Sequence, residues 1–224
     1  MTKAGTVVLV LVLLAVMLLT AFIADKKQGK PVISPKQLAM AGISLALAFI
    51  TSFIRYEMPF GGEVTLFSMF FICFAGYLFG VRVGLLTAFA YSLLQFMHSG
   101  GAYMLTPFQV CCDYFFAFTA LGLSGIWKGK KNGLKIGYVV GCIMRGLFHT
   151  IGGYLYWMDY MPESFPKALA AFYPIIYNYS YIIIEMVATL FVISVPAVKR
   201  ALERIERQSG EGVAVFGKKS EKSA

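Results

Sequence analysis

Charged residues are scarce in this chain of 224 residues: Asp, Glu, Lys and Arg make up 14% of it, whereas hydrophobic residues make up 58% and the mean hydropathy is +0.72. Soluble domains carry about 25% charged residues, so this composition argues against a soluble fold. The chain also has no H-E-x-x-H pattern, no P-loop and no Cys-x-x-Cys pair. These absences argue against a metalloprotease, an ATPase and a cysteine-based metal site.

Long apolar runs are what the chain has instead. They lie at about residues 5–24, 37–54, 64–80, 83–97, 105–127, 134–157 and 171–197. Runs of this kind are typical of membrane-spanning helices, whereas a barrel would show short stretches of alternating polarity. The sequence therefore predicts an all-α integral membrane protein with seven helices. Buried free thiols and no metal site are expected at the cysteines within these runs, which are Cys73, Cys111, Cys112 and Cys142.

Lysine and arginine are distributed unevenly over the loops between these runs. One side has only Lys3, Arg55 and Lys167, and Arg145 lies within a run. The other sixteen are Lys26, Lys27, Lys30, Lys36, Arg82, Lys128, Lys130, Lys131, Lys135, Lys199, Arg200, Arg204, Arg207, Lys218, Lys219 and Lys222. Because short cytoplasmic loops collect these residues, we expect the C-terminus in the cytoplasm and the N-terminus outside. The net charge of +9 then follows from topology and requires no nucleic acid partner.

The first apolar run is interpreted as a retained helix, although a signal peptide is the alternative. Its apolar stretch is longer than a usual signal-peptide core, and cleavage would leave a lysine-rich segment outside. The expected organisation is an extra N-terminal transmembrane helix at 1–25, a cytoplasmic linker at 26–36, a membrane domain at 37–197 and a charged cytoplasmic tail at 198–224. We expect the tail to be disordered after Arg207.

Polar and aromatic side chains lie in or beside the apolar runs and predict a binding site. Polar groups are costly in lipid and persist mainly where they face a bundle interior or a watery cavity. The candidates are Tyr103, Asp113, Tyr114, His149, Trp157, Tyr173 and Asn178. Acidic residues on the outer side accompany them, namely Glu57, Glu63, Asp159 and Glu163. Carboxylates combined with aromatic rings favour a flat heteroaromatic cation as the ligand.

Helical spacing predicts that two faces of this kind meet. The first consists of residues four apart, Arg145, His149, Gly153 and Trp157, and the second of Tyr173, Tyr177, Tyr181 and Glu185. Each candidate also has a simpler explanation. Tyr103 and Trp157 suit a membrane-interface belt, Asp113 and Arg145 can form a structural ion pair, and His149 can be a core histidine. Glu185 can bond to neighbouring helices and contact no ligand.

Several stretches resemble one known family. They are residues 57–66 (EMPFGGEVTL), Gly101 to Tyr103, the run 109–114 followed by 120–125, and His149 followed by Gly153, Trp157, Tyr173 and Asn178. In order and spacing they are similar to the thiamine-specific S components of energy-coupling-factor (ECF) transporters, the ThiT type. The match covers about residues 37–197.

The resemblance implies a six-helix S-component bundle in a bacterial plasma membrane, preceded here by one extra helix. Such a protein is a multi-pass subunit of an ABC importer that captures thiamine outside with high affinity. It has no ATPase of its own, and the resemblance implies no cofactor. Its partners are a transmembrane coupling protein and two cytoplasmic ATPases, which drive its reorientation and the delivery of thiamine to the cytoplasm.

The resemblance also implies roles for single residues. Trp157 would stack on the aminopyrimidine ring, and Tyr103 and Tyr114 would line the pocket. Asp113 stands where the family more usually has glutamate, and His149 would reach the polar end of the ligand.

Two further residues, Tyr173 and Asn178, would complete the hydrogen-bonding edge of the ligand site. The chain lacks a tryptophan that some relatives have near Gly61 and Gly62. The resemblance therefore implies that Glu63 or Phe60 closes the pocket in its place.

Gly42 and Ala46 form a small-xxx-small pair, which lets another helix approach closely in lipid. In the family such a surface docks the coupling protein, and the alternative is packing within the bundle. Two other functions stay open. An S component of this architecture can take another vitamin or a pyrimidine precursor, and a proton-coupled carrier can use Asp113, His149 and Glu185 as a relay.

Overall fold

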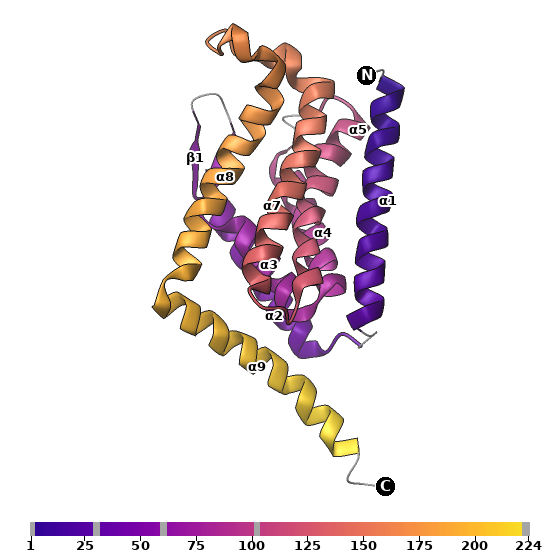
Figure 1. Ribbon diagram of the computed structural model, residues 1–224, viewed down its shortest axis with the longest axis vertical. Helices are drawn as coiled ribbons and strands as arrows, with labels where there is room; N and C mark the ends of the chain where they lie inside the picture. Colours follow the sequence, from indigo (N-terminus) through magenta and orange to yellow (C-terminus); the bar gives the residue numbers. More distant parts are fainter. Residues whose placement is uncertain (1–2, 29–31, 59–61, 101–103, 221–224) are drawn as a thin grey trace.

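The computed structural model describes residues 3–28, 32–58, 62–100 and 104–220, and most of them are helical. A helix is present at each of the seven apolar runs, as Figure 1 shows. The helices are α1 (Lys3–Gln28), α2 (Pro35–Ser52), α3 (Ser68–Phe79), α4 (Val81–His98), α5 (Pro107–Val110), η1 (Cys111–Phe116), α6 (Ala117–Thr119), η2 (Ala120–Trp127), α7 (Gly133–Gly152), η3 (Gly153–Trp157), η4 (Met158–Tyr160), η5 (Lys167–Phe172), α8 (Tyr173–Ser194) and α9 (Pro196–Ser220).

Three helical stretches of the described chain are both long and apolar enough to cross a membrane. They are Pro107–Trp127, Gly133–Tyr160 and Lys167–Ser194. α3 is apolar, but its 12 residues span only about 18 Å, less than the hydrocarbon core of a bilayer. These features support a helical membrane protein, and the number of helices that cross the membrane stays a prediction.

A small β-hairpin replaces the start of the predicted helix at 64–80. β1 (Arg55–Glu57) pairs antiparallel with β2 (Glu63–Thr65), with Tyr56 opposite Val64. α3 therefore begins only at Ser68. The β-branched residues of β2 favour an extended backbone, and Gly62 adopts a φ of 80° that glycine tolerates.

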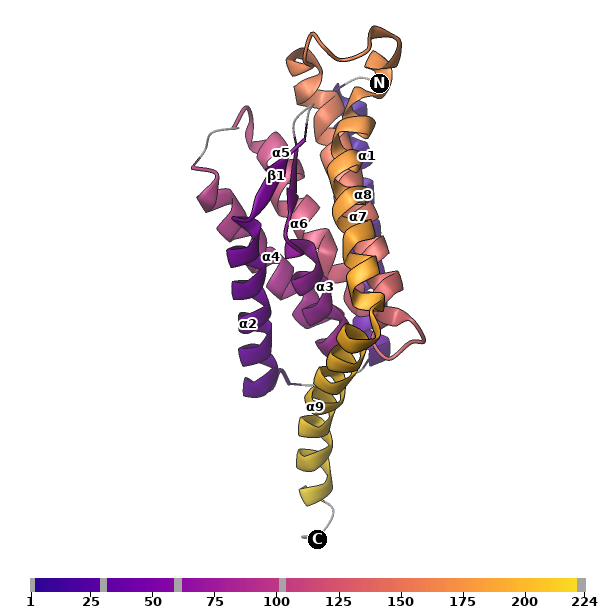
Figure 2. The same ribbon diagram turned by 90° about the vertical axis from the view of Figure 1, so that its left-hand side faces the viewer.

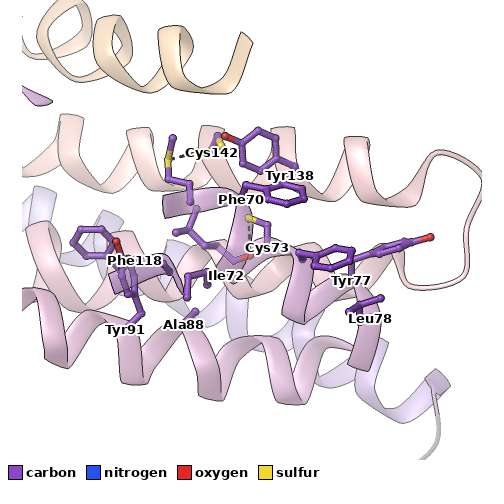
Figure 3. Packing of buried hydrophobic residues seen from close by; sticks show 14 of the residues in the cluster. Phe70, Ile72, Cys73, Tyr77, Leu78, Ala88, Tyr91, Phe118, Tyr138 and Cys142 are labelled. Carbon is purple, nitrogen blue, oxygen red and sulfur yellow. Dashed lines mark hydrogen bonds between the residues drawn. The ribbon is translucent and has the colours of Figure 1, made fainter. Parts of the chain in front are cut away.

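The main hydrophobic core lies where α2, α3, α4, α7 and α8 meet. All but one of the residues of α3 are buried, which is typical of a helix at the centre of a bundle. Figure 3 shows Phe70 of α3 close to Tyr138 of α7, and Tyr91 of α4 against Phe118 with ring centroids 5.3 Å apart. The four cysteines are free, as predicted, and three of them are buried.

Close contact between α4 and η2 depends on two glycines. A Cβ added at Gly122 would lie 2.6 Å from the backbone of Gly84, and one added at Gly84 would lie 2.6 Å from the carbonyl oxygen of Gly122. Real Cβ atoms essentially never come this close to another heavy atom. Small residues of this kind let helices pack tightly in lipid, where van der Waals contact drives association.

Replacing Gly122 with valine is expected to lower the melting temperature of the purified protein by about 4 °C or more, because overpacking costs about 1–3 kcal/mol. Thermal unfolding in detergent measures the shift. Gly42→Ala is the matched control, because nothing lies within 4 Å of the added Cβ. Equal melting temperatures for the two variants would contradict this account of the α4–η2 contact.

The N-terminal helix α1 packs against α4, η2 and α7 and joins a second hydrophobic cluster there. Its C-terminal end makes polar contacts with the bundle. Gln28 donates a side-chain hydrogen bond to the carbonyl of Gly125 (2.8 Å) and accepts one from the backbone N–H of Val81 (3.3 Å). Asp25 forms an ion pair of 2.9 Å with Arg82. These contacts fix the end of α1 beside the α3–α4 corner.

The prediction of a disordered end after Arg207 is wrong, because α9 continues through this segment to Ser220. Its first half packs on the main core through Leu202 and Ile205 and makes polar contacts with the bundle. Tyr77 donates a hydrogen bond to the carboxylate of Glu206 (2.7 Å), and Lys36 donates one to the carbonyl of Gln208 (2.7 Å). Figures 1 and 2 show α9 at the end of the molecule opposite the β-hairpin and the N-terminus.

Candidate functional site

Two π-helical turns carry the central candidate residues. Asp113 and Tyr114 lie in η1, and Trp157 is the last residue of η3. A π turn bonds each N–H to the carbonyl five residues earlier, so it holds one residue more than an α turn, and such turns are frequent at functional sites. The helix before η1 begins at Pro107 and is capped by the side chain of Thr106. These features set the direction in which the side chain of Asp113 points.

Asp113 brings three side chains together, and we refer to Gln109, Asp113, His149 and Trp157 as the Asp113 cluster. Its Oδ2 accepts hydrogen bonds from Nε2 of Gln109 (2.6 Å) and from Nε1 of Trp157 (2.8 Å). Its Oδ1 lies 3.7 Å from Nδ1 of His149. The side chains of Asp113 and His149 are each only 13% exposed. The structure thus unites three residues that the sequence predicts as ligand contacts.

Arg145 continues the cluster along α7. Its Nε–H donates to Nε2 of His149 (3.3 Å), which leaves the imidazole hydrogen on Nδ1, the nitrogen that faces Asp113. The guanidinium lies over the rings of Phe118 (4.6 Å) and Tyr181 (5.9 Å). Arg145 therefore reaches Asp113 only through His149, and the direct ion pair considered from the sequence does not form.

On α8, Asn178 and Tyr181 form a hydrogen-bonded pair. Asn178 donates to the carbonyl of Pro174 (2.8 Å) and accepts from the hydroxyl of Tyr181 (3.0 Å). A Cβ added at Gly153 would lie 2.7 Å from Cβ of Pro174 and 3.4 Å from Nδ2 of Asn178. α8 therefore packs closely against η3. The expected meeting of the two helix faces is confirmed by this approach and by the contact of Arg145 with Tyr181.

Tyr173 begins α8 and is buried against the ring of Phe165, with centroids 5.0 Å apart. Its ring also contacts Tyr177 (5.6 Å), which in turn contacts Tyr181 (6.1 Å). The tyrosines thus form a continuous row on α8, as the four-residue spacing predicts.

Two other candidates, Tyr114 and Glu63, make contacts with residues outside the Asp113 cluster. The ring of Tyr114 packs on Phe96 with centroids 5.6 Å apart. Glu63 lies on the hairpin, where it forms an ion pair of 2.8 Å with Arg55. Tyr103 and Phe60 lie outside the residues that the structure describes.

The sequence interpretation missed the importance of Gln109 and Gly152. Gln109 is completely buried, and its Oε1 accepts a hydrogen bond from the N–H of Leu105 (3.1 Å) while its Nε2 donates to Asp113. Gly152 leaves room for Asp113, because a Cβ there would overlap Oδ1. The four-residue spacing between Gln109 and Asp113 was the available signal.

The cluster is chemically suited to binding a cation or a hydrogen-bond donor. It offers a carboxylate that is held by two N–H donors and flanked by an indole and an imidazole. Within the described ranges, no three His, Cys, Asp or Glu side chains lie close enough to hold a metal ion. A carboxylate beside aromatic rings is the kind of environment that recognises an organic cation.

Comparison with known proteins leads to one family. The family described as Thiamine transporter protein (Thia_YuaJ) matches residues 38–204. The chain is 27% identical over 169 residues to the thiamine transporter ThiT of Bacillus subtilis (strain 168), an alignment that covers 70% of this chain and 85% of that protein.

Two solved structures are also similar. A structure of ThiT from Listeria monocytogenes is 21% identical, has a TM-score of 0.58 and covers 71% of this chain and 91% of its own, which shows a shared fold. A structure of the S component of a bacterial ECF transporter is 20% identical and covers 71% of this chain and 96% of its own. Its TM-score of 0.46 is too low to support the fold by itself.

Proposed function

The chain belongs to the thiamine transporter protein family, and from this membership we propose that it is the high-affinity thiamine-binding S component of an ECF importer. Its relatives are transporters and not enzymes. The observation that carries the proposal is the largely buried carboxylate of Asp113, which accepts hydrogen bonds from Gln109 and Trp157 and lies beside His149. Such a group is energetically costly inside a membrane protein. Ionisable groups that are found there therefore mark candidate functional sites.

Thiamine suits this environment because it combines a cationic ring with a hydrogen-bonding aminopyrimidine. The negative charge of Asp113 attracts the cation, and aromatic faces add about 0.5–2 kcal/mol for each cation–π contact. In the proposed complex the indole of Trp157 stacks on the aminopyrimidine and His149 contacts the polar end. The hydrogen bond from Trp157 to Asp113 then gives way to a bond between Asp113 and the ligand.

The remaining contacts are assigned by their place in the chain. Asn178 lies on the face of α8 that packs against η3, and Tyr173 begins the same helix, so both are assigned to the second wall of the proposed site. Tyr103 and Tyr114 add aromatic lining. Glu63 lies on the hairpin, where it closes the site from outside.

The proposed topology has six helices within residues 37–197 and one extra helix within 1–25. The linker at 26–36 and the tail at 198–224 are placed in the cytoplasm. Loop charge supports this orientation, with the C-terminus inside and the N-terminus outside. The hairpin and the N-terminus lie at one end of the molecule and α9 at the other, which is compatible with it (Figures 1 and 2).

Transport in this proposal requires partners, because the chain has no P-loop. A transmembrane coupling protein binds α2, and two cytoplasmic ATPases drive reorientation of the whole subunit. Gly42 and Ala46 support this surface because both are exposed on α2, and nothing lies within 4 Å of a Cβ added at Gly42. Packing within the bundle does not account for the pair.

A proton-coupled carrier is the less favoured alternative. Its relay would need Asp113, His149 and Glu185 to exchange protons. The carboxylate of Glu185 is instead held by hydrogen bonds from Thr65 and Met69. An S component for another vitamin differs from the main proposal only in its ligand.

Tryptophan fluorescence of the purified full-length protein, titrated with thiamine and separately with riboflavin, tests the ligand and the site together. The chain has two tryptophans, and Trp127 lies at the far end of η2 beside Lys130. We expect saturable quenching by thiamine that disappears in Trp157→Phe. A response to riboflavin alone would assign another vitamin, and quenching retained in the variant would contradict the proposed site.

A further inference from the structure

Glu185 is a buried carboxylate on α8 that takes no part in the Asp113 cluster. It is 2% exposed and accepts three hydrogen bonds from one distant segment. Its Oε2 accepts from the backbone N–H of Thr65 (3.0 Å) and from its hydroxyl (2.7 Å), and its Oε1 accepts from the N–H of Met69 (3.3 Å). A membrane helix thus carries a carboxylate that accepts hydrogen bonds from the junction between β2 and α3.

That junction needs an acceptor from outside itself. Phe67 adopts a left-handed backbone with φ of 61°, which is unfavourable for a bulky residue, and as the N-cap residue of α3 it provides no side-chain hydrogen bond. The hydroxyl of Thr65 also lies 2.5 Å from that of Ser68, so the two are hydrogen-bonded. Because the first N–H groups of a helix attract negative charge, Glu185 satisfies one of them, that of Met69, and its bonds to Thr65 hold the strained corner.

α8 contacts the hairpin at a second point, one helical turn from Glu185. A Cβ added at Gly62 would overlap the ring of Tyr181, so the hairpin backbone lies directly on that ring. The hydroxyl of Tyr181 donates to Asn178 (3.0 Å), one of the proposed ligand residues. The hairpin, Tyr181 and Asn178 therefore form one connected unit.

We infer that Glu185 is a positioning residue that holds the hairpin against α8 and thereby sets how quickly a bound ligand leaves. The inference rests on the proposed function, because it treats the hairpin as the outer cover of the site. Glu185 itself touches no ligand. Loss of its charge frees the β2–α3 junction, and the hairpin then separates more often from Tyr181.

Stopped-flow fluorescence on the full-length protein tests this with Glu185→Gln and Thr65→Val. We expect Glu185→Gln to raise the thiamine dissociation rate about tenfold, since it weakens bonds to a charged group, and Thr65→Val to raise it less. The double variant should show less than the product of the two single effects, because both changes act on the same bond. Thr189→Val is the matched control, since it removes another buried hydrogen bond of α8, from Tyr138 (3.0 Å), that does not reach the hairpin.

Hydrogen exchange of the amides at 62–69 provides a readout that needs no ligand. Faster exchange there in Glu185→Gln than in Thr189→Val supports the inference, whether or not the wild type binds thiamine. Absence of thiamine binding by the wild type would defeat only the proposed function. Unchanged dissociation and exchange, or equal increases in the Thr189→Val control, would overturn the inference.

Discussion

Asp113→Asn is expected to weaken thiamine binding about 10- to 100-fold. In the proposed complex the carboxylate, still held by Gln109, bonds to the ligand, and a hydrogen bond to a charged group contributes about 1.5–3 kcal/mol. An amide removes the charge that attracts the cationic ring and can direct its NH₂ group at the same donors. Isothermal titration calorimetry of the purified variant measures the loss.

Two further variants make the test specific to this carboxylate. Asp113→Glu introduces the glutamate that the family more usually has at this position, and we expect this variant to retain thiamine binding. Asp159→Asn is the same chemical change at an exposed position in η4 and should leave affinity unchanged. If Asp113→Asn bound thiamine as tightly as the wild type, the carboxylate would have no place in the ligand site.

Gly42→Trp and Ala46→Trp are each expected to abolish thiamine uptake by cells while leaving binding by the purified protein intact. Both positions are exposed on α2, so a large side chain meets the partner and not the interior of this chain. Helices that associate through small residues need close backbone contact, which an indole prevents. Uptake of labelled thiamine measures transport, and calorimetry measures binding, since an added tryptophan would alter the fluorescence.

Val187→Trp on α8 is the control for uptake, because this residue is 56% exposed and lies on a different helix. It should transport normally. Loss of binding together with uptake in the α2 variants would indicate a folding defect and count against docking. Normal uptake in both would show that this face is not used.

The sequence predicted the helices well because each is a long apolar run, and in lipid such a run has few alternatives to a helix. It failed at the hairpin, where strands of three residues are too short to produce a recognisable alternation. It failed again at α9, because the charged segment after Arg207 was taken as disordered although the helix continues through it and its Gln208 carbonyl accepts a hydrogen bond from Lys36. Such packing depends on residues more than a hundred positions away.

The candidate site was predictable where a polar group in an apolar run carried its own signal. Asp113, His149 and Trp157 are of this kind, and the structure brings them together. The partner of Arg145 was not predictable. Its spacing fits both a direct ion pair with Asp113 and the observed hydrogen bond to His149. The hydrogen-bond partners of Glu185 could likewise not be predicted from the sequence. The cost of a buried charge indicates that partners exist, but it does not indicate which residues they are.

The π turns at η1 and η3 also constrain how related sequences can differ in length. A wide turn holds one extra residue, so a descendant can lose that residue and still keep an unbroken helix of the same hydrophobicity. The helix beyond the deletion would keep its direction, but the side chains within the turn, such as Asp113 in η1, would be redistributed around the helix axis. In an alignment, a one-residue gap inside 153–157 or 111–116 would therefore separate proteins that keep this ligand geometry from proteins that keep only the fold.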